Sequence, residues 1–278
     1  MIELHEKRDP LDKPRSFLRW AGSKKQILPI LHTHWNSSFT RYVEPFAGSA
    51  CLFFRIQPKR ALLGDINKDL ISTYIEVKYR VAEVIEELSK LEKGRDNYLR
   101  LRGIDVTELT RSEKAARFIY LNRFCFNGLY RTNLKGQFNV PYGGERSGGI
   151  PTDKALRSCS RMLKRANLIA GGFEKVLKKV EPGDFVYLDP PYSVEAKRVF
   201  KEYNAAAFGE TDLYSLRGWL ESLANRNIKF LVSYAESDEA DVLRKDFHSK
   251  VISVRRNIAG FSGSRQRSNE ILISSTTL

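Results

Sequence analysis

Residues 185–192 read Phe-Val-Tyr-Leu-Asp-Pro-Pro-Tyr, an apolar run that leads directly into a carboxylate, two prolines and an aromatic ring. The apolar run predicts a buried strand, which must stop at Asp189 because proline cannot continue a strand ladder. The strand end then offers the Asp189 carboxylate, the Pro190 carbonyl and the Tyr192 ring. This set suits a flat heterocycle whose amino group donates to both oxygens while its ring stacks on the tyrosine. A plain Pro-Pro turn is the alternative, since four-residue matches also arise by accident.

Strand-like and helix-like segments alternate along most of the 278 residues. Strands are expected at 41–46, 61–65, 185–189, 229–234, 251–254 and 271–274. Helical spacing of apolar residues occurs at 70–91, 112–124, 153–165, 173–180 and 213–223. The alternation predicts an α/β fold with a mostly parallel sheet, interrupted by an inserted helical module at about 68–150. Residues 127–151 combine glycines and prolines with aromatic and basic residues, which favours a loop or hairpin.

The chain carries 47 Lys and Arg residues against 33 Asp and Glu residues, a formal net charge of +14. Residues 111–165 hold twelve basic and three acidic side chains, and residues 244–267 hold seven basic and one acidic. The rest of the chain is close to neutral. Two basic segments on a neutral scaffold indicate a polyanion partner. A generally basic surface is the alternative.

The three cysteines, Cys51, Cys125 and Cys159, show neither metal-ligand spacing nor an even disulfide set. We therefore expect reduced thiols, and the four histidines likewise predict no metal site. Polar and charged residues fill the N-terminus, where a secretory signal would need an apolar core. Since no run of 18 apolar residues occurs either, we expect a soluble, cytoplasmic protein without a membrane span.

Two further strand ends carry residues suited to ligands, which in open α/β sheets bind beyond the carboxyl ends of the strands. Residues 44–50 read Glu-Pro-Phe-Ala-Gly-Ser-Ala, and the small residues there let the backbone approach a ligand closely. Asp65, 17 residues after Gly48, is placed to accept hydrogen bonds from ribose hydroxyls. Alternatively, Asp65 or Asn67 caps the helix that follows.

These three strand ends, in this order and after Phe-Leu-Arg-Trp-Ala-Gly-Ser-Lys at 17–24, resemble the Dam-type DNA adenine methyltransferases. The resemblance continues through 120–141, 254–258 and 269–272, and it covers nearly the whole chain after about residue 16. It implies a Rossmann-like methyltransferase domain at 1–67 and 151–278 that binds S-adenosylmethionine, with a target-recognition insert at 68–150. It also implies a monomeric enzyme that acts on double-stranded DNA in a bacterial or phage-infected cell. A restriction endonuclease partner stays an open question here.

The resemblance assigns roles to residues at matching positions. The catalytic set would be Asp189, Pro190, Pro191 and Tyr192. The cofactor pocket would be lined by Trp20, Lys24, Glu44, Phe46, Gly48, Asp65 and Asp189. DNA would be contacted by Arg19, Phe126, Asn127, Leu129, Arg131, Lys135 and Arg256. For Trp20 and Phe126, an ordinary place in the hydrophobic core is the alternative.

The chain departs from the family pattern at two positions. Ala50 stands where the first loop of the family usually has a second glycine, so we expect an intact but slightly displaced cofactor loop. Arg19 replaces a lysine that meets a guanine, and it can pair bidentately with O6 and N7 of that base. Together with residues 126–131, this suggests a GATC-like target.

The implied reaction is an in-line methyl transfer to the amino group of an adenine that has flipped out of the duplex. Cytosine C5 methylation needs an attacking cysteine, usually after a proline, but Ala50, Phe124 and Ser158 precede the three cysteines. Cytosine N4 methylation uses the same chemistry and stays open, although serine is typical there in place of aspartate. Methylation of RNA or protein amino groups is a weaker alternative. A catalytically inactive DNA-binding module is the alternative from another class, and the retained acidic and basic site residues argue against it.

Overall fold

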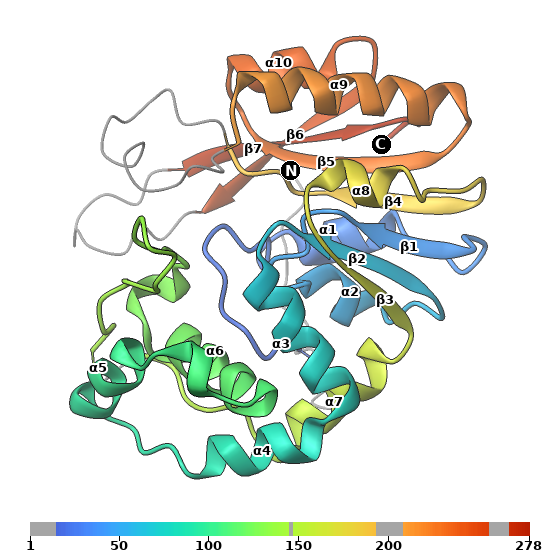
Figure 1. Cartoon of the computed structure of the whole chain (residues 1–278). Coiled ribbons are helices and arrows are strands. Elements are labelled where there is room, and N and C mark those ends of the chain that lie inside the picture. Colours follow the sequence, from blue (N-terminus) through green and yellow to red (C-terminus); the bar gives the residue numbers. More distant parts are fainter. Residues whose placement is uncertain (1–14, 145–146, 193–207, 256–266) are drawn as a thin grey trace.

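The computed structural model describes residues 15–144, 147–192, 208–255 and 267–278 of the protein. In these residues a seven-stranded sheet has the order β3-β2-β1-β4-β5-β7-β6, with helices on both faces (Figure 1). The strands are β1 Arg41–Glu44, β2 Ala61–Asp65, β3 Ala166–Ala170, β4 Asp184–Leu188, β5 Lys229–Ala235, β6 His248–Arg255 and β7 Arg267–Ser274.

Strands β1 to β5 are parallel to one another, whereas β7 runs antiparallel to both β5 and β6. From β1 the chain moves outward through β2 and β3, and then returns to β4 on the other side of β1. The carboxyl ends of β1 and β4 therefore form a topological switch point, the place where open α/β sheets bind ligands. The predicted Rossmann-like, mostly parallel sheet is confirmed.

Helices cover both faces because each strand alternates its side chains between them. On β4, Phe185 and Tyr187 join the core shared with helices α1 to α7, whereas Val186 and Leu188 join the core under helices α8 to α10. Full burial of an apolar side chain of this size contributes about 1.5–3 kcal/mol. The helices are α1 Leu28–Thr33, α2 Cys51–Ile56, α3 Lys68–Tyr79, α4 Val81–Ser89, α5 Arg95–Gly103, α6 Arg111–Phe124, α7 Asp153–Leu163, α8 Phe173–Leu177, α9 Glu210–Asn225 and α10 Asp238–Arg244.

The prediction of one helix over 70–91 is wrong. The segment forms α3 and α4, which meet at Arg80, where φ of −130° and ψ of 41° leave the helical region. The apolar spacing continues across this bend because α3 and α4 both pack on α6 and α7, and α3 also packs on β2 and β3. Since α3 contacts both the sheet and α6, the division between a catalytic domain and an insert at residue 68 stays a prediction.

Helix α6 begins within one residue of its predicted start because Thr110 and Glu113 form a reciprocal capping box. The Thr110 hydroxyl accepts from the Glu113 N–H at 3.3 Å, and the Glu113 carboxylate accepts from the Thr110 N–H at 2.7 Å. Beyond α6, isolated antiparallel bridges join Cys125 to Tyr142 and residue 132 to residue 138, so the first part of the segment predicted as a loop or hairpin folds back on itself. In the part of the chain that the structure describes, no helix is long and apolar enough to cross a membrane.

Candidate active site

Four side chains from distant parts of the chain meet at the switch point. Lys24 lies in the turn before α1, Asp189 and Tyr192 follow β4, and Glu270 lies on β7 opposite Ala235 of β5. Lys24 Nζ lies 2.9 Å from Asp189 Oδ1 and 3.5 Å from Glu270 Oε2. It also donates a hydrogen bond to Tyr192 Oη at 2.6 Å. We call these four residues the ammonium–carboxylate cluster.

Asp189 is held through one of its two carboxylate oxygens. Its Oδ1 contacts Lys24 and also accepts a hydrogen bond from Ser233 Oγ at 3.3 Å. Ser233 is fully buried on β5 and shares a 2.8 Å hydrogen bond with Tyr187 Oη. Among the described residues both partners of Asp189 contact Oδ1, so Oδ2 can accept hydrogen bonds from a ligand.

Burial and neighbouring charges shift the pKa values of this cluster in opposite directions. Burial raises the pKa of Asp189, while the Lys24 ammonium opposes that rise. Burial would lower the pKa of Lys24, but Asp189, Tyr192 and Glu270 outweigh it and raise that pKa above its ordinary value. Lys24 therefore stays an ammonium at neutral pH and favours the ionised form of Asp189.

The half-buried Tyr192 ring is held from two sides. Its Oη donates to Glu270 Oε1 at 3.1 Å, and its ring stands edge-on to Tyr234 with the centroids 5.1 Å apart. Burial raises the pKa of the Tyr192 hydroxyl to about 12 although Lys24 opposes the rise, so the hydroxyl remains a donor at neutral pH. A ring fixed in this way suits a stacking contact with a planar ligand.

The loop after β1 and the end of β2 form the adjoining part of the site. Asp65 accepts the Gly48 N–H at Oδ2 and the Asn67 N–H at Oδ1, each at 2.9 Å. Gly48 has a φ of +46°, and a Cβ there would lie 2.9 Å from the Trp20 ring. Trp20 is half-buried and stacks on Tyr130, with the ring planes 16° apart. Glycine therefore lets the Trp20 ring lie directly on the loop.

Two carboxylates border this loop. Asp65 does not cap α3, because Asn67 does so by accepting the Leu70 N–H at 3.0 Å. Burial raises the pKa of Asp65, and its bonds from the Asn67 and Gly48 N–H groups oppose the rise. Glu44, at the end of β1, is 3% exposed, and its Oε2 has no hydrogen-bond partner in the described residues. Burial raises the pKa of Glu44 well above its ordinary range, although the neighbouring Tyr42 hydroxyl opposes the rise. A buried acceptor without a partner suits a ligand donor.

Two further residues of the loop after β1 shape the packing and the backbone conformation of that loop. Phe46 is half-buried and stacks on Phe173 with the centroids 5.3 Å apart. Ala50 precedes α2 with a φ of +49°, a conformation that the glycine usual in the family adopts more readily. The loop nevertheless keeps the bond from Gly48 to Asp65. At the end of β4, Pro190 is buried and Pro191 is exposed.

Arg19 lies beside the hairpin segment that carries the other predicted DNA contacts. Asn122 fixes its backbone, accepting the Arg19 N–H at 2.8 Å and donating to the Arg19 carbonyl at 2.6 Å. The Arg19 guanidinium donates to the Arg123 carbonyl at 3.2 Å. A Cβ at Gly128 would lie 2.8 Å from Arg19 Cβ. The structure therefore brings residue 19 and residues 126–131 together.

Three of the predicted DNA contacts follow α6 directly. Phe126 is 45% exposed, so the core alternative is wrong for this residue. Asn127 is exposed and takes a left-handed conformation with a φ of 53°. Leu129 is half-buried. An exposed ring and amide side by side suit contact with a macromolecule.

The predicted basic contacts lie further along the hairpin. The Arg131 guanidinium donates to the Asn139 side-chain oxygen at 2.7 Å, which fixes its direction. Lys135 is exposed. Arg256 lies outside the described residues.

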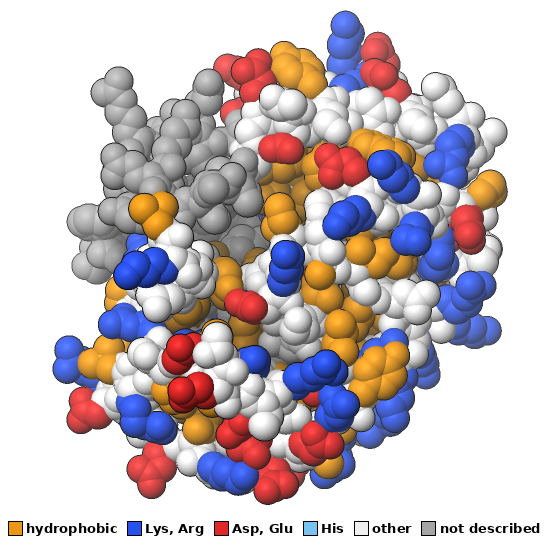
Figure 2. Space-filling view, viewed as in Figure 1, with side chains coloured by type: hydrophobic (Ala, Val, Ile, Leu, Met, Phe, Trp, Pro, Cys, Tyr) orange, Lys and Arg blue, Asp and Glu red, His pale blue; other side chains and the backbone are white. Residues whose placement is uncertain are grey.

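Five more basic side chains of the segment 111–165 lie on α7 and in the turn that follows it. Helix α7 leads into β3 at the amino edge of the sheet, where the Arg165 carbonyl accepts the Ala61 N–H. Figure 2 shows Lys and Arg side chains over this part of the molecule. The exposed ones are Lys154, Arg157, Arg161, Lys164 and Arg165. Arg165 therefore lies at the amino edge of the sheet, at the opposite end of the strands from the ammonium–carboxylate cluster.

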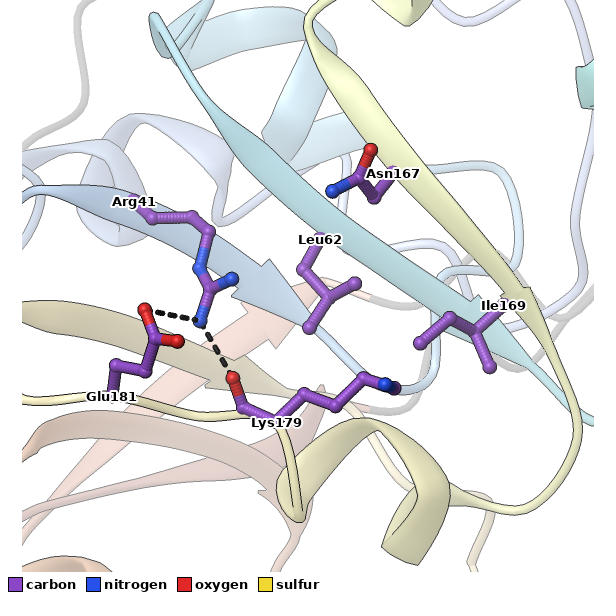
Figure 3. Close-up of a pocket in the computed structure, with 6 residues that line it drawn as sticks. All are labelled: Arg41, Leu62, Asn167, Ile169, Lys179 and Glu181. Carbon is purple, nitrogen blue, oxygen red and sulfur yellow. Dashed lines mark hydrogen bonds and ion pairs between the residues drawn. The ribbon is translucent and has the colours of Figure 1, made fainter.

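A cavity of about 420 Å³ also lies at this amino edge (Figure 3). Arg41 there forms an ion pair with buried Asp184, with 2.6 Å between the guanidinium and Oδ2, and it donates to the Lys179 carbonyl at 2.7 Å. The lining residues are Arg41, Leu62, Asn167, Ile169, Lys179 and Glu181. None of the predicted site residues lines this cavity, so it is separate from the candidate active site.

Glu270 and Ser233 contact the predicted catalytic residues, but no role was predicted for either. Glu270 does carry a sequence signal, because it directly precedes the apolar run 271–273, and a charged residue next to a buried strand needs a partner. Ser233 carries none, since a small polar residue is ordinary within a strand.

Comparison with known proteins gives consistent matches. The model of the D12 class N6 adenine-specific DNA methyltransferase family matches residues 20–258. The chain is 34% identical to Type II methyltransferase M1.LlaDCHI of Lactococcus lactis subsp. cremoris, over 93% of this chain and 94% of that protein. It is 34% identical to Type II methyltransferase M.MjaIII of Methanocaldococcus jannaschii, over 88% and 92%. It is 30% identical to the DNA adenine methylase of Escherichia coli K12, over 94% and 95%.

Proposed function

The chain belongs to the family of D12 class N6 adenine-specific DNA methyltransferases, and we propose that it acts on a GATC-like site through the ammonium–carboxylate cluster. The family transfers a methyl group from S-adenosylmethionine to the N6 amino group of adenine in DNA. The observation that carries the proposal is the end of β4. There Asp189 is held through Oδ1 by Lys24 and Ser233, with buried Pro190 beside it.

The side chains beyond β1 and β2 fit the cofactor, which supplies a methyl group on a positively charged sulfur. Each oxygen of Asp65 accepts one backbone N–H and keeps a lone pair that a ribose hydroxyl can use. Glu44 adds a buried oxygen without a partner in the described residues. We assign Trp20, Phe46 and Gly48 to the walls of this pocket. Buried carboxyl groups among aromatic rings suit a ligand that combines hydroxyls with a heterocycle.

Asp189 and Pro190 act on the amino group of adenine. The Asp189 Oδ2 atom and the Pro190 carbonyl each accept one amino hydrogen, which favours a lone pair localised on the nitrogen. Without these bonds that lone pair is delocalised into the ring and is a poor nucleophile. Because Lys24 favours the ionised form of Asp189, the carboxylate remains an acceptor at neutral pH. Holding the two reactants in line supplies most of the rate gain.

The target base must leave the duplex, because its amino group is unreachable inside the stack. Tyr192, fixed at its hydroxyl by Glu270 and at its ring by Tyr234, provides the face on which the extruded adenine stacks. The hairpin with exposed Phe126 and Lys135 contacts the surrounding DNA. We place Lys135 and Arg256 against phosphates.

Recognition of the target involves the surface formed by Arg19 and the hairpin. Arg19 reads the first guanine of the GATC-like site through a bidentate pair in the major groove. Asn127 and Arg131 read or position the central base pairs. Because Asn139 orients the Arg131 guanidinium, that residue reaches the DNA with little loss of side-chain freedom.

Mapping of modified bases tests the proposal. Plasmid DNA without adenine methylation is incubated with the protein and S-adenosylmethionine, and modified bases are then located at single-nucleotide resolution. We expect N6-methyladenine within GATC, and no modification by the variant Asp189→Ala. Methyladenine in a different short motif would overturn the target but leave the reaction. N4-methylcytosine, or no modification by the folded protein, would contradict the assigned chemistry.

A further inference from the structure

We propose that Glu270 is a positioning residue that offsets the charge of Lys24, so that Lys24 does not fully neutralise the Asp189 carboxylate that faces the reacting groups. The inference rests on the function proposed above and concerns the same site. It starts from the observation that Lys24 has two carboxylate partners rather than one, at 2.9 Å and 3.5 Å.

The three charged groups are poorly hydrated, so the balance of their charges affects how strongly they interact with a ligand. The side chain of Lys24 is 7% exposed, that of Glu270 is 5% exposed and that of Asp189 is 22% exposed. With Lys24 and Asp189 alone, the positive and negative charges would cancel, and the carboxylate would be a weak acceptor. Glu270 adds a second carboxylate beside the single Lys24 ammonium, so removing its charge makes the cluster more positive by one unit. Interactions between charges are stronger in such a poorly hydrated place than in water.

The negative charge of Glu270 has a use on the ligand side. The sulfur of S-adenosylmethionine is a cation, whereas the sulfur of the product S-adenosylhomocysteine is neutral. The charge of Glu270 therefore favours the substrate over the product, and it also strengthens Asp189 as an acceptor for the adenine amino group. The same negative charge also stabilises the positive charge that develops on that nitrogen during methyl transfer.

Glu270 has a second contact that a test must separate from its charge. It accepts a hydrogen bond from Tyr192 Oη at 3.1 Å, so its loss also releases one end of the ring. Glu270→Gln keeps the size of the side chain and an oxygen that can accept this hydrogen bond, but it removes the charge. Glu270→Ala removes both contributions.

A residue on the neighbouring strand end provides a matched control. Glu236 follows β5 and accepts a hydrogen bond from Asn269, the residue before Glu270, at 2.7 Å. Its side chain is exposed, so its charge is screened by solvent and salt. Glu236→Gln makes the same chemical change close to Glu270 but outside the cluster.

The experiment measures the dissociation constants of S-adenosylmethionine and S-adenosylhomocysteine for the full-length protein by titration calorimetry. For Glu270→Gln we expect about tenfold weaker binding of S-adenosylmethionine, the order that one partly buried charge produces, with S-adenosylhomocysteine within about twofold of wild type. Glu236→Gln should leave both constants unchanged. Single-turnover methylation by Glu270→Gln should slow by at least about tenfold, and Glu270→Ala should lose more because Tyr192 is also released.

The outcomes separate this inference from the proposed function. If Glu270→Gln weakens both ligands equally, or neither, the charge role is refuted even where methylation by the wild type is intact. If the folded wild type binds neither ligand, the proposed function fails first. A selective loss of the cationic ligand, absent in Glu236→Gln, supports the inference because a purely structural defect would not distinguish the two ligands.

Discussion

Replacing Lys24 with methionine removes the charge shared by Asp189 and Glu270 and keeps much of the side-chain volume. At an effective dielectric constant of about 20, charges 3–4 Å apart interact by about 4 kcal/mol or slightly more. Desolvation offsets part of this gain, and breaking a buried ion pair costs about 3–5 kcal/mol. Because Asp189 remains 22% exposed, we expect a loss of stability at the lower end of this range, about 3 kcal/mol. A loss of about 3 kcal/mol corresponds to a melting temperature lower by about 6–12 °C.

The pH dependence of this loss identifies its origin. The pKa of Lys24 is raised, so its contribution to stability is complete below the ordinary lysine value of 10.5 and is lost only as pH rises through the higher folded value. Without Lys24, the pKa of Asp189, already raised by burial, rises further. A carboxyl group with a raised folded pKa costs stability above that pKa, and the cost disappears when it takes up a proton. The loss should therefore be largest near pH 8 and shrink toward pH 5.

Urea unfolding of the wild type and Lys24→Met at several pH values measures this difference. A double variant, Lys24→Met with Glu270→Gln, supplies the control, since removing one of the two carboxylates that Lys24 contacted should restore part of the lost stability. A loss that stays constant between pH 8 and pH 5, without recovery in the double variant, would refute the electrostatic explanation and indicate lost packing.

Three further predictions follow from the site. Asp189→Ala should abolish methyl transfer but change DNA affinity less than about threefold, because phosphate contacts dominate that affinity; gel-shift and methylation assays on one preparation measure both, and normal turnover would contradict the mechanism. Arg19→Ala should reduce selection of the first guanine by about 5- to 150-fold, the range for one bidentate pair; competition between substrates measures this, and an unchanged ratio would remove Arg19 from recognition. Changing Cys51, Cys125 and Cys159 to alanine should leave methyl transfer in place; if one change abolishes activity in a protein that still folds and binds cofactor, covalent catalysis returns to consideration.

The central strands could be predicted because burial on both faces leaves a continuous apolar run. Strands β4 and β5 are such runs, and each was predicted within two residues. Strand β3 escaped prediction because it forms the edge of the sheet, where only Ala166 of its five residues is fully buried. An edge strand needs no apolar run, so its sequence resembles that of a loop.

The predicted length of the helix after β2 was wrong for a different reason. A hydrophobic stripe reports which residues face a core, but it does not report whether that core is one surface or two. Both α3 and α4 pack on α6 and α7, and α3 also packs on β2 and β3, so both bury their apolar side chains although the helix breaks at Arg80. The predicted chemistry was unaffected, since the Asp65 carboxylate lies before the bend.

The candidate site combines residues that a local sequence motif identifies with a residue that only the pairing of the strands places there. The end of β4 carries Asp189, Pro190 and Tyr192 within four residues, so a local motif was sufficient to find them. The position of Glu270 depends on β7 running antiparallel between β5 and β6, which places the residue opposite the last residue of β5. No local pattern encodes that pairing, because it depends on which edge the last strand joins. The charge balance at Asp189 is therefore a property of the assembled sheet, and substitutions in β7 should alter the reaction even though β7 carries no catalytic motif.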